Sequence, residues 1–234
     1  MSLRDKPSPP TDRREFIGRL ATAAVALSAT ACASAAGAAA TGPAPAPSSR
    51  PPVKWDDAWT SRITGKHKAV FDAPEIADGT VVANAYVWMK GFKDVYGARD
   101  DEMSAVLVIR HGGIAMAMDD TYWEKYELGR ANKVKDPGTK KWAKRNPFLK
   151  PDPADAASAP FTLEALAARG AILLGCNLAA MGMAAELAEK LKRPVDEMRA
   201  EVKSHLIPGL TLAPSGVFGV MRAQEAGCTY IRST

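Results

Sequence analysis

The chain has 234 residues, with 31 lysines and arginines against 26 aspartates and glutamates, which gives a net charge of +5. Hydrophobic residues make up 47% of it and aromatic residues 7%, and there are three cysteines. This composition excludes a polytopic membrane protein, a collagen-like or heptad fibre and a small scaffold built on disulfides. A chain of this length is expected to form one domain, or at most two small ones.

The first 35 residues differ in character from the rest. Two adjacent arginines, Arg13 and Arg14, are followed one residue later by two apolar residues, and an uncharged stretch of small, weakly apolar residues begins at Leu20. This pattern looks like a twin-arginine (Tat) export signal. We therefore expect a signal peptide over residues 1–36, cleaved within the small residues 33–35, and a periplasmic mature protein. A membrane-anchored helix or a disordered tail is the alternative.

Cys32 closes the uncharged stretch and allows a second alternative, a lipid anchor attached after cleavage. Without that anchor, the chain is expected to meet the membrane only in transit. Residues 37–53 are rich in proline and alanine and predict an extended linker. Once residues 1–35 are removed, 26 basic and 23 acidic residues remain, a net charge of +3. This charge gives no reason to expect nucleic acid as a partner.

Beyond the linker, short apolar runs alternate with helical periodicity, the pattern of parallel α/β sheets. The predicted strands cover residues 67–72, 104–110, 171–175, 210–213 and 228–232. The predicted helices cover residues 75–96, 118–126, 162–169, 177–191, 194–206 and 217–226. Together they predict a single domain over residues 54–234, a three-layer α/β/α sandwich with a five-stranded, mainly parallel sheet.

A basic loop interrupts this pattern at about residues 129–160. It contains seven lysines and arginines from Lys133 to Lys150, several prolines and glycines, and no sustained period. Loops of this length are uncommon in a compact domain and usually form lids or mobile segments. The loop is therefore expected either to control access to a site or to be a solvated insertion without a role.

Chemistry in an open parallel sheet is expected beyond the carboxyl ends of its strands. Cys176 follows the third predicted strand and begins a helix, whose unpaired N–H groups and dipole favour a thiolate; the alternative is a small buried hydrophobic residue. His111 follows the second strand and is a candidate to assist the thiol, to bind metal or to hydrogen-bond its own loop. The candidate ligand-binding residues around them are Gly112, Gly113, Asn177, Ser215 and Gly216.

Three segments carry a resemblance to a known family. They are residues 170–182 (GAILLGCNLAAMG), 209–217 (GLTLAPSGV) and 224–231 (QEAGCTYI). These segments resemble the DsrE family of small α/β proteins, and the resemblance runs from about residue 67 to residue 232 with the basic loop as an interruption. Its sharpest motif is the cysteine after the third strand, followed by a helix that begins with small residues.

The resemblance implies that Cys176 accepts sulfane sulfur as a persulfide, as in the related sulfur-relay proteins. It also implies a homo-oligomer, since the family forms homo-trimers or mixed hexamers, and a sulfur-donor or acceptor protein as a partner. The sulfur-relay proteins are cytoplasmic, so an exported member departs from the pattern, and enzyme activity is left open. The competing hypothesis is a non-catalytic periplasmic module of the same fold that binds a small ligand, a metal or a partner.

Other chemistries lack their motifs. The chain has no Cys-x-x-Cys or His-x-x-x-His pair, no glycine-rich phosphate loop and no Gly-x-Ser-x-Gly elbow, so neither a cofactor nor a structural metal is expected. Copper(I) is a weaker alternative, because thioethers, imidazole and thiolate suit it, although helix-spaced methionines more often fill a core. The residues concerned are Met116, Met118, Met181 and Met183, with His111 and Cys176. Cys176 and Cys228 are expected at opposite edges of the sheet, too far apart for a disulfide.

Overall fold

The computed structural model describes residues 54–152 and 155–234. The expected signal peptide, the linker and Cys32 lie outside these residues. In the part that is described, no helix combines the length and the apolar character needed to cross a bilayer.

The five strands of this part form one sheet in the order β4-β3-β2-β1-β5. Their bounds are β1 (His67–Ala73), β2 (Met103–Ile109), β3 (Ile172–Cys176), β4 (Leu210–Ala213) and β5 (Thr229–Arg232). All four neighbouring pairs are parallel. The central strand β2 is buried along its whole length, as its unbroken apolar run requires.

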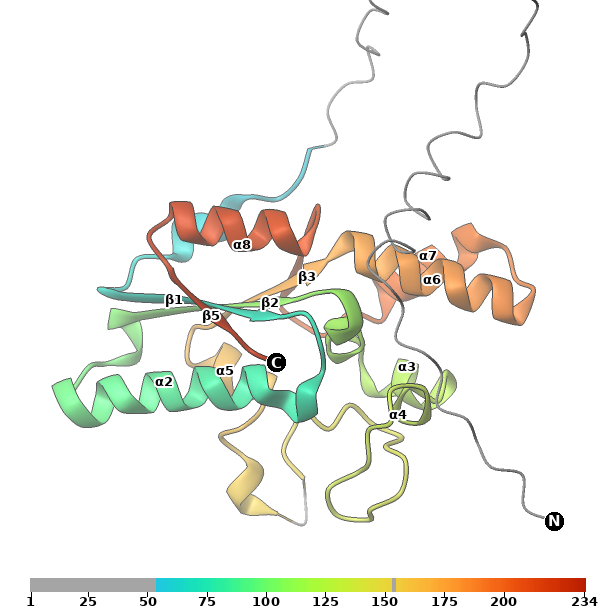
Figure 1. Cartoon of the computed structure of the whole chain (residues 1–234), viewed down its shortest axis with the longest axis horizontal. Helices are drawn as coiled ribbons and strands as arrows, with labels where there is room; N and C mark the ends of the chain where they lie inside the picture. The colour runs from blue at the N-terminus through green and yellow to red at the C-terminus, as the bar shows by residue number, and fades with distance from the viewer. Residues whose placement is uncertain (1–53, 153–154) are drawn as a thin grey trace, which may run out of the picture. The chain divides into compact units, whose positions relative to one another are not determined.

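Helices cover both faces of the sheet, so the predicted three-layer α/β/α sandwich is confirmed. The helices in the described ranges are α2 (Thr80–Tyr96), α3 (Asp120–Lys125), α4 (Leu128–Ala131), α5 (Leu163–Ala168), α6 (Asn177–Leu191), α7 (Val195–Ser204) and α8 (Gly216–Glu225). Short 3-10 turns are η1 (Ala58–Arg62), η2 (Ala77–Gly79), η3 (Asp100–Glu102), η4 (His111–Ala117) and η5 (Ala156–Ser158). Figure 1 shows α8 on one face, α2 and α5 on the other, and the α6–α7 pair extending beyond the carboxyl ends of the strands.

Two hydrophobic clusters hold these layers together. The smaller one lies between the sheet and α8 and includes Val70, Val106, Val108 and Leu174. The larger one lies on the opposite face, under α2, and continues to the buried Trp123. Because side chains alternate along a strand, these clusters show which strand residues face α8 and which face α2.

Helix α2 begins later than its periodicity predicts. The helix was expected from residue 75 but starts at Thr80, because Ala77 and Asp78 have φ values of 40° and 51° and Gly79 has a φ of 81°. A left-handed backbone cannot continue a right-handed helix. The predicted end is confirmed, since the helix ends at Tyr96 and Gly97 caps it with a φ of 66°.

The basic loop is tied to the domain through a buried asparagine. Asn146 has no exposed surface, and its Nδ2 donates to the carbonyl oxygens of Met116 (2.9 Å) and Met118 (2.7 Å). A backbone bridge between Lys135 and Trp142 closes a hairpin within the loop. The described part of the loop therefore has a defined scaffold, although its sequence shows no period.

Candidate functional site at the carboxyl edge of the sheet

The topology brings the predicted site residues to one edge of the sheet. His111 and Ser215 follow the strands β2 and β4, Cys176 ends β3, and these three strands are direct neighbours in the order β4-β3-β2. Their carboxyl ends therefore meet on the same side, where the helices α6 and α8 begin.

Cys176 is both the last residue of β3 and the N-cap of α6. Its Sγ accepts a hydrogen bond from the backbone N–H of Ala179 at 3.4 Å, and the residue is 7% exposed. A side chain that accepts N–H bonds at the start of a 15-residue helix lies at the positive end of the helix dipole. The sulfur therefore lies at the start of a helix, where a backbone N–H donates to it.

A buried ion pair that the sequence analysis did not identify lies next to this thiol. Asp72 is 2% exposed, and its carboxylate accepts hydrogen bonds from Arg110 Nε at 2.6 Å and from an Arg110 terminal nitrogen at 2.8 Å. The hydroxyl of Tyr230 donates a third hydrogen bond to the same carboxylate at 2.8 Å. A bidentate pair of this kind fixes the plane of the guanidinium group.

Strand alternation places Arg110 and Cys176 on the same face of the sheet. Val108 and Leu174 face α8, so Arg110 and Cys176, each two residues further along, face the same way. The register pairs Ile109 with Gly175, which brings the two residues level. The hydrogen bond to Asp72 raises the pKa of the Arg110 guanidinium, and Cys176 lies close enough to act in the same direction.

Gly216 leaves room for the arginine. A Cβ at this position would lie 2.4 Å from Arg110 Cβ and 2.6 Å from Arg110 Cδ, so the start of α8 packs directly against the arginine side chain. Ser215 caps α8, and its Oγ accepts the N–H of Phe218 at 3.1 Å. Both residues are ligand-binding candidates from the sequence; in the structure Gly216 packs against Arg110, and Ser215 caps the helix α8 that begins with Gly216.

His111 and its glycines lie on the turn η4. His111 is exposed, and within residues 54–152 and 155–234 it makes no hydrogen bond or ion pair, so of its three alternatives the one in which it hydrogen-bonds its own loop is not seen. The backbone does this instead, because the N–H of Gly113 lies 2.9 Å from the Arg110 carbonyl oxygen. A Cβ on Gly113 would lie 2.6 Å from the carbonyl oxygen of Ala73, whereas Gly112 is exposed and uncrowded.

The remaining candidates are Asn177 and the methionines that were considered as copper ligands. Asn177 is the first residue of α6 and is half-buried. Met116 and Met118 have no exposed surface and belong to the larger core cluster, as expected of methionines that fill gaps. The described ranges contain no group of three histidine, cysteine or acidic residues arranged to hold a metal.

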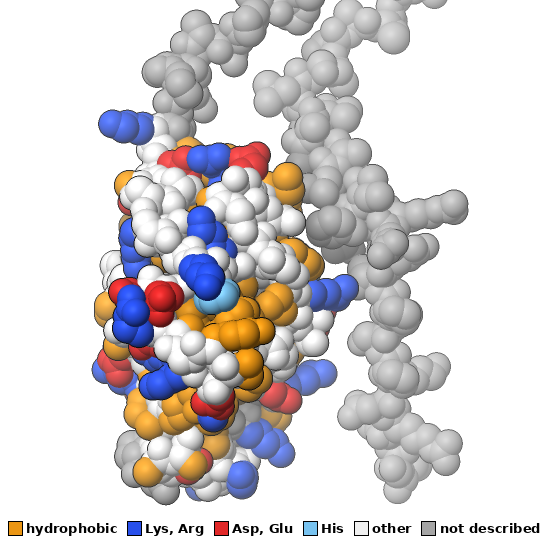
Figure 2. Space-filling view, turned by 90° about the vertical axis from the view of Figure 1, so that its left-hand side faces the viewer, with side chains coloured by type: hydrophobic (Ala, Val, Ile, Leu, Met, Phe, Trp, Pro, Cys, Tyr) orange, Lys and Arg blue, Asp and Glu red, His pale blue; other side chains and the backbone are white. Residues whose placement is uncertain are grey.

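Cys228 lies at the opposite edge, just before β5, and both it and Cys176 are free thiols. That amino edge also carries a hollow of about 400 Å³ lined by Lys66, His67 and Lys68 together with Trp88 and Phe92. Figure 2 looks onto this face and shows hydrophobic side chains gathered beside a histidine and basic residues. The His67 ring lies 4.1 Å from the Phe92 ring, centroid to centroid, so this histidine takes part in aromatic packing away from Cys176.

No protein-family model matches the chain, and no curated protein matches it. Among solved structures, the chain is similar to that of a protein of unknown function, MTH1491 from Methanobacterium thermoautotrophicum. The identity is 14%, the match covers 71% of this chain and 98% of that chain, and the TM-score is 0.32. A likeness of this degree supports no statement about function, which rests on the geometry of the site.

Proposed function

We propose that this protein is a DsrE-like sulfur carrier in which Cys176 accepts a sulfur atom as a persulfide. The observation that carries the proposal is the position of the Cys176 thiol at the N-terminus of α6, level with Arg110. With thiosulfate as donor, the thiolate attacks the outer sulfur, the S–S bond of thiosulfate breaks, and sulfite leaves with the electron pair. The product is a cysteine persulfide anion, and no separate oxidant or reductant is needed.

Each neighbour has a role in this step. The N–H groups that begin α6 stabilise the thiolate, and the Arg110 guanidinium attracts the anionic donor and offsets the charge of the departing sulfite. Asp72 and Tyr230 are positioning residues that hold the guanidinium. His111 is the candidate assisting residue, which would act from the solvent side because its ring is exposed.

We further propose the cellular setting that the sequence favours. The twin-arginine pattern supports export to the periplasm, and the DsrE resemblance supports a homo-oligomer that exchanges sulfur with a donor or acceptor protein. Size measurement in solution tests the oligomer. Replacing Arg13 and Arg14 by lysine tests the route, since it should leave the chain in the cytoplasm.

The sulfur-carrier proposal is tested by intact mass. The chain is incubated with thiosulfate, and the expected result is the gain of one sulfur atom that disappears in Cys176→Ser and remains in Cys228→Ser. Arg110→Gln is expected to slow the gain without preventing it. If Cys176 is unreactive and no variant gains a sulfur atom, the proposal is overturned. The competing hypothesis then remains, a non-catalytic module of the same fold that binds a small ligand or a partner.

A further inference from the structure

The positive charge of the domain is concentrated in the basic loop. Residues 129–150 contain eight lysines and arginines and one acidic residue, Asp136, a net charge of +7. Residues 54–234 carry a net charge of only +2, so the rest of this range carries −5. The domain therefore has one strongly basic segment, and the remainder of it is acidic.

The cations are presented on an ordered hairpin over residues 133–144, the lysine hairpin. Asp136 fixes its turn, because its Oδ1 accepts the backbone N–H groups of Gly138 at 3.2 Å and Thr139 at 2.8 Å. These backbone bonds lower the pKa of Asp136, so its carboxylate stays ionised in neutral solution. The turn is thus held by a group that does not titrate near neutral pH.

Only part of this charge is neutralised by neighbouring acids. Lys144 pairs with Glu124 at 3.5 Å, and Arg145 pairs with Asp136 at 3.4 Å. Four other lysines of the hairpin are exposed, and no carboxylate in the described part of the chain forms an ion pair with them: Lys133, Lys135, Lys140 and Lys141.

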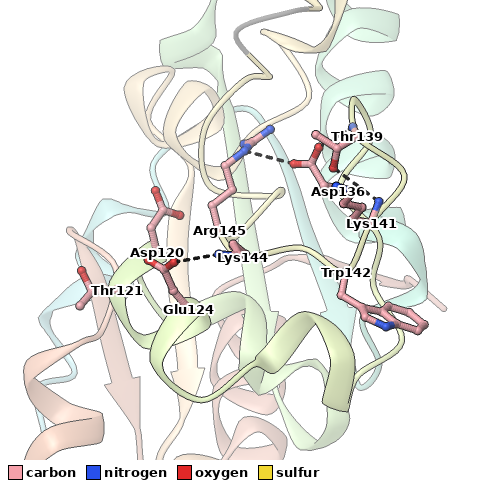
Figure 3. A pocket seen from close by; sticks show the side chains of 9 residues that line it. All are labelled: Asp120, Thr121, Glu124, Asp136, Thr139, Lys141, Trp142, Lys144 and Arg145. Atoms are coloured by element: carbon pink, nitrogen blue, oxygen red, sulfur yellow. Dashed lines mark hydrogen bonds and ion pairs between the residues drawn. The ribbon is translucent and has the colours of Figure 1, made fainter.

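An exposed tryptophan accompanies these lysines. Trp142 is 46% exposed, and Lys135 Nζ lies 5.8 Å from the centre of its ring. Trp142 lines a hollow of about 460 Å³ whose opposite wall, on α3, carries Asp120 and Glu124, and Figure 3 shows its ring directed away from these two acids. The hairpin therefore presents lysines and an indole, while the acids lie at its base.

We propose that the lysine hairpin binds the surface of a bilayer that contains anionic phospholipid. Lysines attract the lipid phosphates, and tryptophan prefers the depth of the headgroups. A flat anionic surface can contact the exposed lysines and the indole together, whereas a nucleic-acid strand lying in the hollow would meet Asp120 and Glu124. Only one aromatic ring projects from the hairpin, and Lys135 lies over it, so the row of stacking platforms typical of single-strand binding is not present there.

Two of the lysines allow a substitution that suits the backbone. Lys133 and Lys140 both have a φ of 59°, a conformation that asparagine tolerates better than most residues. The variant Lys133→Asn with Lys140→Asn removes two charges while keeping the turns. Each lysine near an anionic surface contributes about a fivefold gain in binding, so this variant should bind about 30-fold more weakly. Lys66→Gln with Lys93→Gln removes the same charge from exposed positions at the amino edge and serves as the control.

The test measures co-sedimentation of the full chain with vesicles of phosphatidylglycerol and phosphatidylcholine, compared with phosphatidylcholine alone. All variants keep residues 1–53, so differences among them come from the lysines. The expected result is binding that needs phosphatidylglycerol, weakens in concentrated salt and falls only in the hairpin variant. Equal binding to both kinds of vesicle, or equal binding by the hairpin variant and the control, overturns the proposal. So does tighter binding of a fluorescent single-stranded oligonucleotide through the same lysines.

Discussion

Replacing Asp72 by asparagine tests the buried pair that supports the site. The carboxylate is 2% exposed and accepts three hydrogen bonds, two from Arg110 and one from Tyr230. Asparagine keeps the shape but replaces one charged oxygen by an NH₂ group that faces these donors. A hydrogen bond to a charged group contributes about 1.5–3 kcal/mol, and breaking a fully buried pair costs about 3–5 kcal/mol. The Arg110 side chain is 27% exposed and regains some water, so we expect a loss of about 3 kcal/mol.

The loss is measured as a shift in the melting temperature. In a domain of this size about 3 kcal/mol corresponds to a decrease of about 6–12 °C. The control is Asp101→Asn, because Asp101 pairs with Arg99 while their side chains are 71% and 68% exposed, and water screens such a pair almost completely. If the two variants melted within about 2 °C of each other, Asp72 would not have the role assigned to it.

Three further predictions, tested with four substitutions, concern local packing, helix capping and titration. Gly113→Ala should destabilise the fold by about 1–3 kcal/mol, because its Cβ would lie 2.6 Å from a backbone oxygen, whereas Gly182→Ala on α6, with nothing within 4 Å, should stabilise it by about 0.5–1 kcal/mol. Urea midpoints that move in the same direction would contradict this pair. Thr162→Ala should cost about 1 kcal/mol, since its Oγ caps α5 at 3.1 Å, and an unchanged midpoint would show that the cap is unimportant. Burial raises the pKa of Cys228 to about 11. The folded state therefore keeps a proton that the unfolded chain releases near pH 8.5, so stability is lost as the pH rises from about 8.5 towards 11. Unfolding curves for Cys228→Ala should decline less over this range, and parallel curves would refute the assignment.

Much of the fold could be predicted because the strands are apolar and the helices amphipathic. The helix over residues 177–191 and the strand over residues 210–213 have the bounds that their patterns predict. The start of α2 could not be predicted, because the left-handed φ values of Ala77 and Asp78 leave no mark in the periodicity. The hairpin in the basic loop was missed for a related reason: it depends on a buried contact, that of Asn146, and not on a repeating pattern.

The site could be located from the sequence only in part. The predicted strand bounds placed Cys176 and His111 at the carboxyl ends of parallel strands, where the structure has them. The pairing of Asp72 with Arg110 depends on β1 lying beside β2, and Tyr230 joins them because β5 lies beside β1. Strand order follows from long-range packing and cannot be read from composition. One signal was present, since an aspartate inside an apolar strand needs a partner when it is buried.

The most direct test of the central claim compares the two buried thiols within one folded protein. Cys176 and Cys228 are 7% and 6% exposed, so accessibility differs little between them and their electrostatic surroundings decide their reactivity. Alkylation of the native chain at neutral pH, resolved by peptide mass spectrometry, is predicted to modify Cys176 much faster than Cys228, and to slow at Cys176 in Arg110→Gln. Equal rates at the two cysteines, or a Cys176 rate that is unchanged in Arg110→Gln, would contradict the account.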